Sequence, residues 1–343
     1  MRMVSPIQVT RPFGEKTMLL DHYVSQVHLR KFYSPVLGDR MYAIRKTDLK
    51  AFTPDSESVC KIMDGSTNAY LWEDRAIEEF LKTIEPKYNA ALDKLINRKI
   101  DNECIYTIAG FVAFVITCSP AGMRIQSGPL KSWVETRTTM LDAQGLFPPP
   151  PPVLAGTNLT ELLRNGAVEV VIDPKFPQAI GISSILKLTV LLGNFKWQIL
   201  HNNFDDSPFF TSDFPAAIEK TDDPHILNRI VPLAPNLALR IMPDRTLDRS
   251  RLDFAFAKFR YHTRNISRQE LAKLNCLIVR CAEVTVFYRD DSPWVQPFIA
   301  KNRHYRIAPY TQELKTPTGT LLVSTQRVVP STPPVEPTKA SAG

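Results

Sequence analysis

The stretch IYTIAGFVAFVIT, residues 105–117, is the most hydrophobic part of the sequence and decides how its neighbours must fold. It carries no charged side chain, and Pro120 follows shortly after it. A helix needs about 20 apolar residues to span a bilayer, so this stretch is too short for a membrane segment. It predicts a buried helix, without membrane contact, around which the other elements pack.

The composition is typical of a soluble globular protein. Hydrophobic residues make up 44% and charged residues 22% of the 343 residues, which is enough chain for one large domain or two smaller ones. The formal net charge of +7 is compatible with an anionic partner, but no block of Lys or Arg is longer than two residues. Nucleic-acid binding is therefore only weakly supported.

The cysteines and the N-terminus indicate a reducing, cytoplasmic location. The five cysteines are scattered without a C-x-x-C pair, which favours neither a disulfide framework nor a zinc site. The first residues, MRMVSPIQVTRPFGEK (1–16), lack the apolar run of a secretory signal. The sequence alone identifies no cofactor and no set of metal ligands.

Helical patterns dominate the chain up to about residue 195. Periodic apolar residues predict helices over 71–99, with an interruption at Pro86, and over 132–144 and 177–195. Pro86 removes a backbone donor and clashes with the preceding turn, so the first of these helices is expected to restart there.

Strand patterns follow. KWQILHNN (196–203) and PFFTSD (208–213) predict a hairpin, and Ser267 with Glu270 predicts the capping box of a closing helix. Runs of helices followed by runs of strands are typical of the α+β class. We therefore expect a helical central part packed on a mostly antiparallel C-terminal sheet.

The chain is expected to form one domain with loose ends. Residues 1–20 predict a loose N-terminal arm, 21–312 a single α+β domain, and 313–343 a disordered tail rich in Pro, Ser and Thr. GLFPPPPPVLAGTN (145–158) contains five consecutive prolines, which favour a stiff extended segment. We interpret it as a long surface loop, while a domain boundary is the alternative.

The stretch DHYVSQVHLRKF (21–32) is the first candidate for a functional site. On a helix, His22, Gln26 and Arg30 would lie along one polar line and could contact a ligand with a row of donors. The alternative is that His22 and Gln26 satisfy backbone groups at the start of the helix. His28 would lie on another side and is expected to be packed rather than reactive.

The stretch FFTSDFP (209–215) is the second candidate. A strand would carry Thr211, Ser212 and Asp213 to its end, where Asp213 could act as a base or a metal ligand. Alternatively, Asp213 caps a helix formed by FPAAIEK (214–220). Common catalytic patterns, including G-x-S-x-G, a Walker A loop, H-E-x-x-H and G-x-G-x-x-G, are missing from the sequence.

Four stretches in order resemble the signature of one family. DHYVSQVHLRKF resembles an H-Y-V-P-Q-x-x-L-R-x-F opening, with Ser25 where proline is usual, and WEDRAIEEFLKTIE resembles the acidic helix that follows. WQILHN, PFFTSDFPAA and VPLAPNLALRI resemble a T-S-D-x-P hairpin and a P-L-S-P strand. RNISRQELAKLNCLIVRCAEVTVFYRD resembles the closing helix and strand. Together they are similar to the largely bacterial domain-of-unknown-function family 4238, across about residues 20–290.

This family carries no established activity, so the resemblance implies important positions rather than a reaction. The positions that match its signature are His22, Tyr23, Gln26, Thr211, Ser212 and Asp213. The resemblance favours the hypothesis that the opening stretch and the T-S-D turn share one site.

Two functions from different classes remain open. The first is a hydrolase that acts on a phosphodiester or another anionic substrate, with His22 as acid/base, Asp213 as metal ligand or orienting group, and Ser212 in the same catalytic set. The second is a non-catalytic module that senses a small molecule or binds a protein partner, for example in a stress or phage-defence setting. For the hydrolase, the acidic helix would add Glu78 or Glu85, and Arg124 would bind an anion. The candidate binding residues are Tyr23, Gln26, Arg30, Thr211 and Arg124. In the non-catalytic module, the polar row would bind the ligand or partner, and the T-S-D turn would be architecture.

Overall fold

The central helix predicted from the sequence is the core of the fold. The computed structural model describes residues 19–331 except 155 and 318. Helix α4 (Asn102–Cys118) is buried along almost its whole length, and Asp101 caps its first turn by accepting a hydrogen bond from the Cys104 backbone N–H at 2.9 Å. The helix is apolar all round, which is the pattern of a helix surrounded by other elements.

Other helices surround α4 or extend from it. The predicted restart at Pro86 is confirmed, because a short 3-10 turn (Glu85–Lys87) separates two helices at this point. The predicted single helix over 177–195 is wrong: the chain breaks at Ser184, and the two parts are bent by 61°. The helices are α2 (Ala76–Ile84), α3 (Tyr88–Ile96), α5 (Pro120–Ala143), α6 (Leu159–Arg164), α7 (Lys175–Ser183) and α8 (Ile185–Asn194).

Two larger sheets complete the α+β body, as the sequence predicts. In the five-stranded sheet every pair is antiparallel except β10 with β5, and the order is β10 (Arg260–Asn265), β5 (Lys196–His201), β9 (Leu237–Met242), β8 (Leu227–Ala234) and β7 (Ala217–Lys220). The four-stranded sheet is antiparallel, in the order β3 (Ala51–Phe52), β2 (Tyr42–Arg45), β11 (Thr285–Tyr288) and β6 (Thr211–Ser212).

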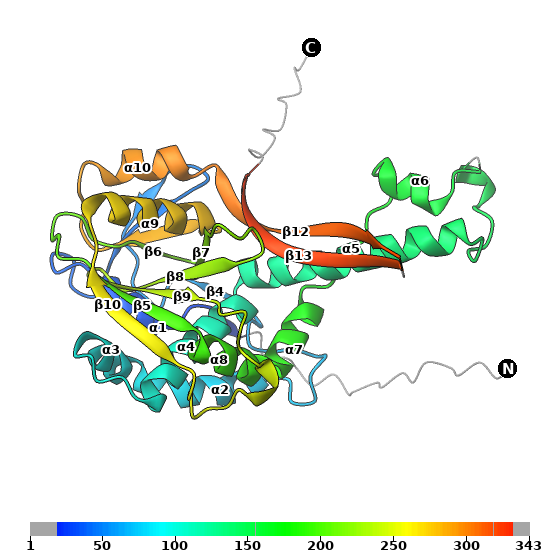
Figure 1. Ribbon diagram of the computed structural model, residues 1–343. Coiled ribbons are helices and arrows are strands. Elements are labelled where there is room, and N and C mark those ends of the chain that lie inside the picture. Colours follow the sequence, from blue (N-terminus) through cyan, green and yellow to red (C-terminus); the bar gives the residue numbers. More distant parts are fainter. Residues whose placement is uncertain (1–18, 155, 318, 332–343) are drawn as a thin grey trace, which may run out of the picture.

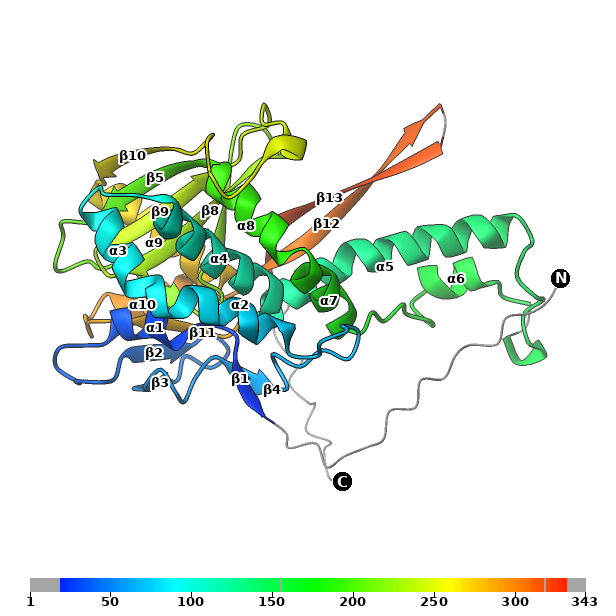
Figure 2. The same ribbon diagram turned by 90° about the horizontal axis from the view of Figure 1, so that it is seen from below.

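The five-stranded sheet lies between two layers of helices. Helices α3, α4 and α8 cover one face, while α9 (Arg268–Cys281) and α10 (Val295–Asn302) lie on the other side (Figures 1 and 2). Trp197 on β5 joins the sheet to helix α8, since its indole N–H donates a hydrogen bond to the Leu192 carbonyl at 2.9 Å. Buried apolar side chains from both layers and from the sheet form one continuous core.

Of the capping box predicted for α9, the hydrogen bond to the Ser267 side chain is confirmed. The Ser267 hydroxyl accepts a hydrogen bond from the Glu270 backbone N–H at 3.2 Å. The carboxylate of Glu270 pairs with Arg240 at 3.2 Å and with Arg264, on two strands of the sheet. Glu270 therefore fastens the helix to the polar face of the sheet.

The predicted hairpin between residues 196–203 and 208–213 is wrong. Strand β5 pairs with β9 and β10, whereas β6 belongs to the other sheet and pairs with β11. Each strand is buried by neighbours distant in sequence, and such tertiary contacts override a local pairing preference. The T-S-D turn is thereby placed next to the closing strand rather than opposite β5.

The predicted disordered tail is wrong for residues 313–331. Strands β12 (Tyr305–Thr316) and β13 (Gly319–Pro330) form a continuous antiparallel hairpin. The Pro, Ser and Thr content of the segment favours disorder, but its β-branched residues and leucines favour a strand, and the two strands pair along the whole ladder. The hairpin β12–β13 and helices α5 and α6 project from the body, and together they are called the arm (Figures 1 and 2). Residues 332–343 lie outside the described part of the chain.

The N-terminal segment joins the body through a small two-stranded sheet. Strand β1 (Leu20–His22) pairs with β4 (Lys61–Met63), and helix α1 (Gln26–Leu29) continues as a 3-10 turn (Arg30–Phe32). Of the predicted loose arm, residues 1–18 lie outside the described part of the chain. The Pro-rich loop holds only one 3-10 turn, Pro152–Leu154, among its described residues.

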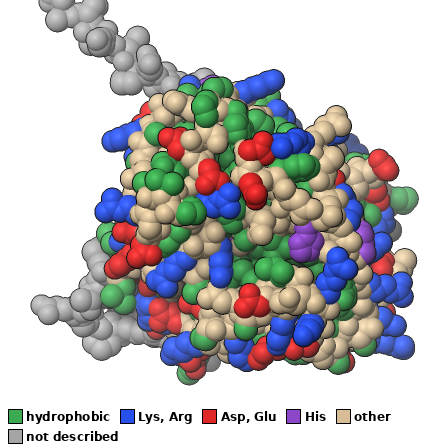
Figure 3. Space-filling model, turned by 90° about the vertical axis from the view of Figure 1, so that its left-hand side faces the viewer, with side chains coloured by type: hydrophobic (Ala, Val, Ile, Leu, Met, Phe, Trp, Pro, Cys, Tyr) green, Lys and Arg blue, Asp and Glu red, His purple; other side chains and the backbone are tan. Residues whose placement is uncertain are grey.

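On the face of the body that is turned away from the arm, charged and hydrophobic side chains are intermixed, and no single patch dominates. On that face Lys and Arg alternate with Asp and Glu (Figure 3). Among the described helices, none is by itself long and apolar enough to cross a membrane, although α4 with α5 and α7 with α8 would pass by length and composition as bent pairs.

The burial of α4 makes a direct prediction. Phe111 is 1% exposed, and Phe111→Ala should lower the free energy of unfolding by about 3–5 kcal/mol through lost burial and a residual cavity. Trp72 is 95% exposed, so Trp72→Ala should change the free energy of unfolding by no more than about 0.5 kcal/mol. Denaturant unfolding of both variants measures this, and equal effects would show that α4 is not the core.

Candidate functional site

The polar row predicted in the opening stretch lines a groove. His22 at the end of β1, together with Gln26 and Arg30 on the α1 segment, forms one wall of a cavity of about 360 Å³. Glu78 of α2 and Glu85 after it line the same cavity. The residues predicted as ligand-binding row and as added carboxylates are thus brought together.

The groove carries opposite charges on its two sides. Arg30 donates to the Gln26 side-chain oxygen at 3.0 Å and to the Ser56 hydroxyl at 3.3 Å, while His22 Nε2 lies 3.2 Å from the Glu57 carbonyl oxygen. Glu78 pairs with Arg75 on the other side.

Ser25 explains how this chain departs from the usual opening. Its φ of −56° lies in the range that proline fixes, so the start of α1 keeps the geometry of the family pattern. Its hydroxyl donates to the Glu85 carboxylate at 2.5 Å, a bond that proline could not make. The replacement therefore links α1 to the end of α2.

Asp213 is bound by backbone rather than exposed in a cleft. Its carboxylate accepts hydrogen bonds from the N–H groups of Glu283 (2.9 Å), Val284 (2.7 Å) and Thr285 (3.0 Å). Burial raises the pKa of Asp213 to about 6, against the opposing effect of these three donors. The helix that Asp213 would have capped over 214–220 is not formed, since strand β7 occupies residues 217–220. Asp213 instead fixes the loop before β11.

The neighbours of Asp213 are also engaged. The buried Ser212 hydroxyl accepts a hydrogen bond from the Phe214 N–H at 3.1 Å. Arg124, predicted to bind an anion, forms a two-pronged ion pair with Glu283, at 2.9 and 2.5 Å. Asp213 and Arg124 therefore hold the same loop from two directions.

His28 connects the two signature stretches in the interior. One ring nitrogen lies 2.8 Å from the Tyr88 hydroxyl and the other 2.9 Å from the Thr211 hydroxyl, and the ring stacks on Phe111 at 4.7 Å between centroids. Burial lowers the pKa of His28 to about 3, so the imidazole is neutral at physiological pH. The expectation that His28 is packed is confirmed.

Lys46 is a second buried polar residue, and the sequence did not predict it. Lys46 donates from Nζ to the carbonyl oxygens of Ala282 (2.5 Å) and Tyr305 (2.9 Å), and burial lowers its pKa to about 8. Tyr23 lies in the same region, where burial, followed by Cys60 and Asp213, raises its pKa. A lone lysine just after strand β2 gives no signal in the sequence that its amine turns inward.

The predicted residues thus divide between two places. His22, Gln26 and Arg30 line the surface groove, whereas Thr211, Ser212 and Asp213 are buried at β6 and just after it. Asp213 does not line the groove that holds His22. Across residues 19–331 without 155 and 318, no three His, Cys, Asp or Glu side chains are grouped to hold a metal ion.

The fold defines an α+β protein in which an opening helix and a T-S-D turn meet at a buried histidine. The chain belongs to the family described as protein of unknown function DUF4238, whose model matches residues 21–292. The resemblance seen in the sequence is therefore confirmed. No curated protein and no solved structure matches the chain.

The geometry around Asp213 predicts a structural role. Asp213→Asn leaves one acceptor oxygen for three N–H donors and should lower the free energy of unfolding by about 2 kcal/mol. Asp206→Asn is the control, because that exposed carboxylate pairs only with Arg268 and Ser207 on the surface and its loss should leave the melting temperature nearly unchanged. An Asp213→Asn protein as stable as the wild type would contradict this role.

Proposed function

We propose that the protein is a non-catalytic interaction module that pairs with a second copy of itself through the outer edge of strand β13. The observation that carries the proposal is that, among the described strands, none pairs with this edge. Hydrolysis by His22 and Asp213 stays a prediction. The bonds that occupy Asp213, Ser212 and Arg124 give it less support than the arm gives to binding.

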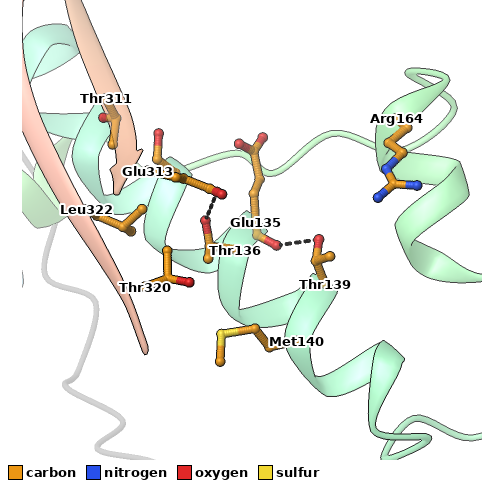
Figure 4. Close-up of a pocket in the computed structure, with 10 residues that line it drawn as sticks. Glu135, Thr136, Thr139, Met140, Arg164, Thr311, Glu313, Thr320 and Leu322 are labelled. Carbon is orange, nitrogen blue, oxygen red and sulfur yellow. Dashed lines mark hydrogen bonds between the residues drawn. The ribbon is translucent and has the colours of Figure 1, made fainter. Parts of the chain in front are cut away.

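The arm exposes apolar side chains on a projecting surface. Helix α5 and the hairpin diverge and leave a cleft of about 390 Å³, which Thr136 and Glu313 bridge by a hydrogen bond of 2.9 Å (Figure 4). Trp133 on α5 is 60% exposed beside this cleft. Large apolar groups exposed together are typical of surfaces that bind a partner.

The two strands of the hairpin differ in how they are protected. Strand β12 contains Pro309, Glu313 and Lys315, residues that discourage pairing with another chain, and it packs along α5. Residues 320–326 of β13 contain no charge and no proline, and the ladder has no bulge. Among the described strands, only β12 pairs with β13. Soluble proteins rarely leave such an edge uncovered.

A second copy is the occupant that this edge fits best. Two copies can join β13 to β13 in antiparallel order about a two-fold axis, because one surface then meets its own image. The marginal two-stranded ribbon becomes a four-stranded sheet with every inner backbone group paired. The hairpin also lies beyond residues 21–292, so the pairing would be a property of this chain's addition to the family domain.

Charge substitution at a cross-strand pair tests the proposal. Leu321 on β13 and Leu314 on β12 face each other and are 53% and 44% exposed. We expect the wild type to sediment at twice the 38.8 kDa chain mass and Leu321→Lys to sediment as a monomer, since a lysine on an edge blocks strand addition. Leu314→Lys, one strand further from the edge, should remain dimeric.

Analytical ultracentrifugation over a wide concentration range measures both masses. A monomeric wild type, or equal loss of the dimer in both variants, would contradict pairing through β13. Melting temperatures near that of the wild type would show that neither variant has unfolded.

A further inference from the structure

A second hollow lies at the surface beside α8, away from the groove of the opening stretch. It encloses about 560 Å³, within the roughly 300–1,000 Å³ of small-molecule sites. Its floor is apolar, with Leu188 and Leu191 from α8, Ile116 from α4, and Phe195 and Ile241 from the sheet side. Thr325 and Gln326 at the base of the hairpin close one side.

The charged residues of this hollow are all cationic. Arg229, Arg245 and Arg249 line it, and its described lining includes no Asp or Glu. Arg245 is neutralised by Asp223, at 2.7 Å. Within the part of the chain that the structure describes, Arg229 and Arg249 pair with no carboxylate, which leaves two positive charges at an apolar surface.

Arg229 is the more buried of the two and binds only neutral acceptors. Its guanidinium donates to the Ala216 carbonyl at 3.2 Å and to the Gln326 side-chain oxygen at 2.6 Å. Burial lowers its pKa to about 10, so it still carries its charge at neutral pH. A buried charge without a counter-ion is unfavourable, and an anion in the hollow would relieve this.

The apolar floor continues beyond the arginines. A neighbouring hollow of about 620 Å³ shares Leu191 and Arg249 with the first and follows the outer side of α8. Leu186 and Phe254 line it and are 49% and 44% exposed. Lys187 and Asp253 lie on its lining as well. The two hollows adjoin and form one trough, with apolar side chains along α8, that leads away from a pair of arginines without a carboxylate partner.

We propose that this trough binds a free single-chain anionic amphiphile, an alkyl carboxylate or alkyl phosphate. Arg229 and Arg249 hold the anionic head group, and the alkyl chain lies along α8 over Leu191 and Leu186. A small inorganic anion would leave the apolar floor exposed to water, and a neutral lipid would leave the arginines unpaired. The proposal does not require the pairing of β13, although Thr325 and Gln326 at the base of that strand line the trough.

Isothermal titration calorimetry with four twelve-carbon probes, each kept monomeric, tests the head-group requirement. Dodecanoate and dodecyl phosphate should bind the full-length protein, whereas dodecanol and dodecyltrimethylammonium should bind at least about tenfold more weakly. Equal binding of dodecanol and dodecanoate would overturn the proposal, because the arginines would then recognise nothing.

Substitution of each arginine tests the assigned contacts. Arg229→Gln and Arg249→Gln should each raise the dissociation constant of dodecanoate by about tenfold or more, because a charge-assisted bond is lost. Arg249 is exposed, so its variant remains informative if Arg229→Gln fails to fold. The control Arg306→Gln removes an exposed arginine on β12 and should bind like the wild type. Unchanged affinity in a folded Arg249→Gln would contradict the site.

A membrane surface is the competing source of the same chemistry. Vesicles that contain anionic phospholipid should not sediment the protein, since the trough fits one chain rather than a bilayer. Sedimentation with vesicles, together with no binding of monomeric dodecanoate, would overturn the proposal in favour of a lipid surface.

Discussion

The two hydrogen bonds of the His28 ring hold together parts of the chain that are far apart in sequence. His28 lies on α1, Tyr88 on α3 and Thr211 on β6, and the ring rests on Phe111 of the central helix. A neutral imidazole donates at one nitrogen and accepts at the other, so it can bond both hydroxyls without burying a charge. A protonated ring would have two donors and an uncompensated charge in the core. The packing of the opening stretch on α4 and β6 therefore depends on a neutral His28 imidazole.

This arrangement separates what holds the fold from what is free to bind. The T-S-D turn and Arg124 secure the loop before β11, and their polar atoms already have partners. Within the described part of the chain, the groups that lack such partners lie elsewhere. They are the outer edge of β13, which pairs with no further strand, and Arg229 and Arg249 in the trough, which pair with no carboxylate. Both sites involve strand β13 of the hairpin: the edge runs along the strand, and Gln326 at its base accepts a hydrogen bond from Arg229. A ligand in the trough and a partner on the edge would therefore act on one strand.

Local patterns predicted the elements that local physics determines. The uncharged run of α4, the restart at Pro86 and the Ser267 cap each depend on a few neighbouring residues, and each is confirmed. The α+β class followed from the order of such elements. The partners of β5 and β6 could not be predicted, because strand pairing is decided by which distant segments bury each face. The hairpin at 305–330 was not predicted, because the Pro, Ser and Thr content favours disorder and its β-branched residues do not alternate regularly.

The candidate site shows the same division. His22, Gln26 and Arg30 line one groove with Glu78 and Glu85. The predicted helix through all three is wrong, because His22 ends strand β1 and only Gln26–Leu29 is α-helical. The predicted shared site of His22 and Asp213 divides between the groove and the interior, and the opening stretch contacts the T-S-D turn through His28 and Thr211 instead. No sequence pattern distinguishes an aspartate that binds three backbone N–H groups from one that faces a cleft. The inward turn of Lys46 depends in the same way on carbonyl groups supplied by distant segments.

The pH dependence of unfolding tests the neutrality of His28 most directly. The pKa of the ring is 6.5 in the unfolded chain and about 3 in the fold, so the unfolded state binds the proton first. Stability from this group is fully present above pH 6.5 and is lost as the pH falls toward 3, by about 1.4 kcal/mol per pH unit. Denaturant unfolding of the wild type and of His28→Gln, compared over this range, cancels the contribution of other groups. The account predicts that the difference in unfolding free energy between the two proteins shrinks by that slope below pH 6.5. A difference that stays constant with pH would contradict it.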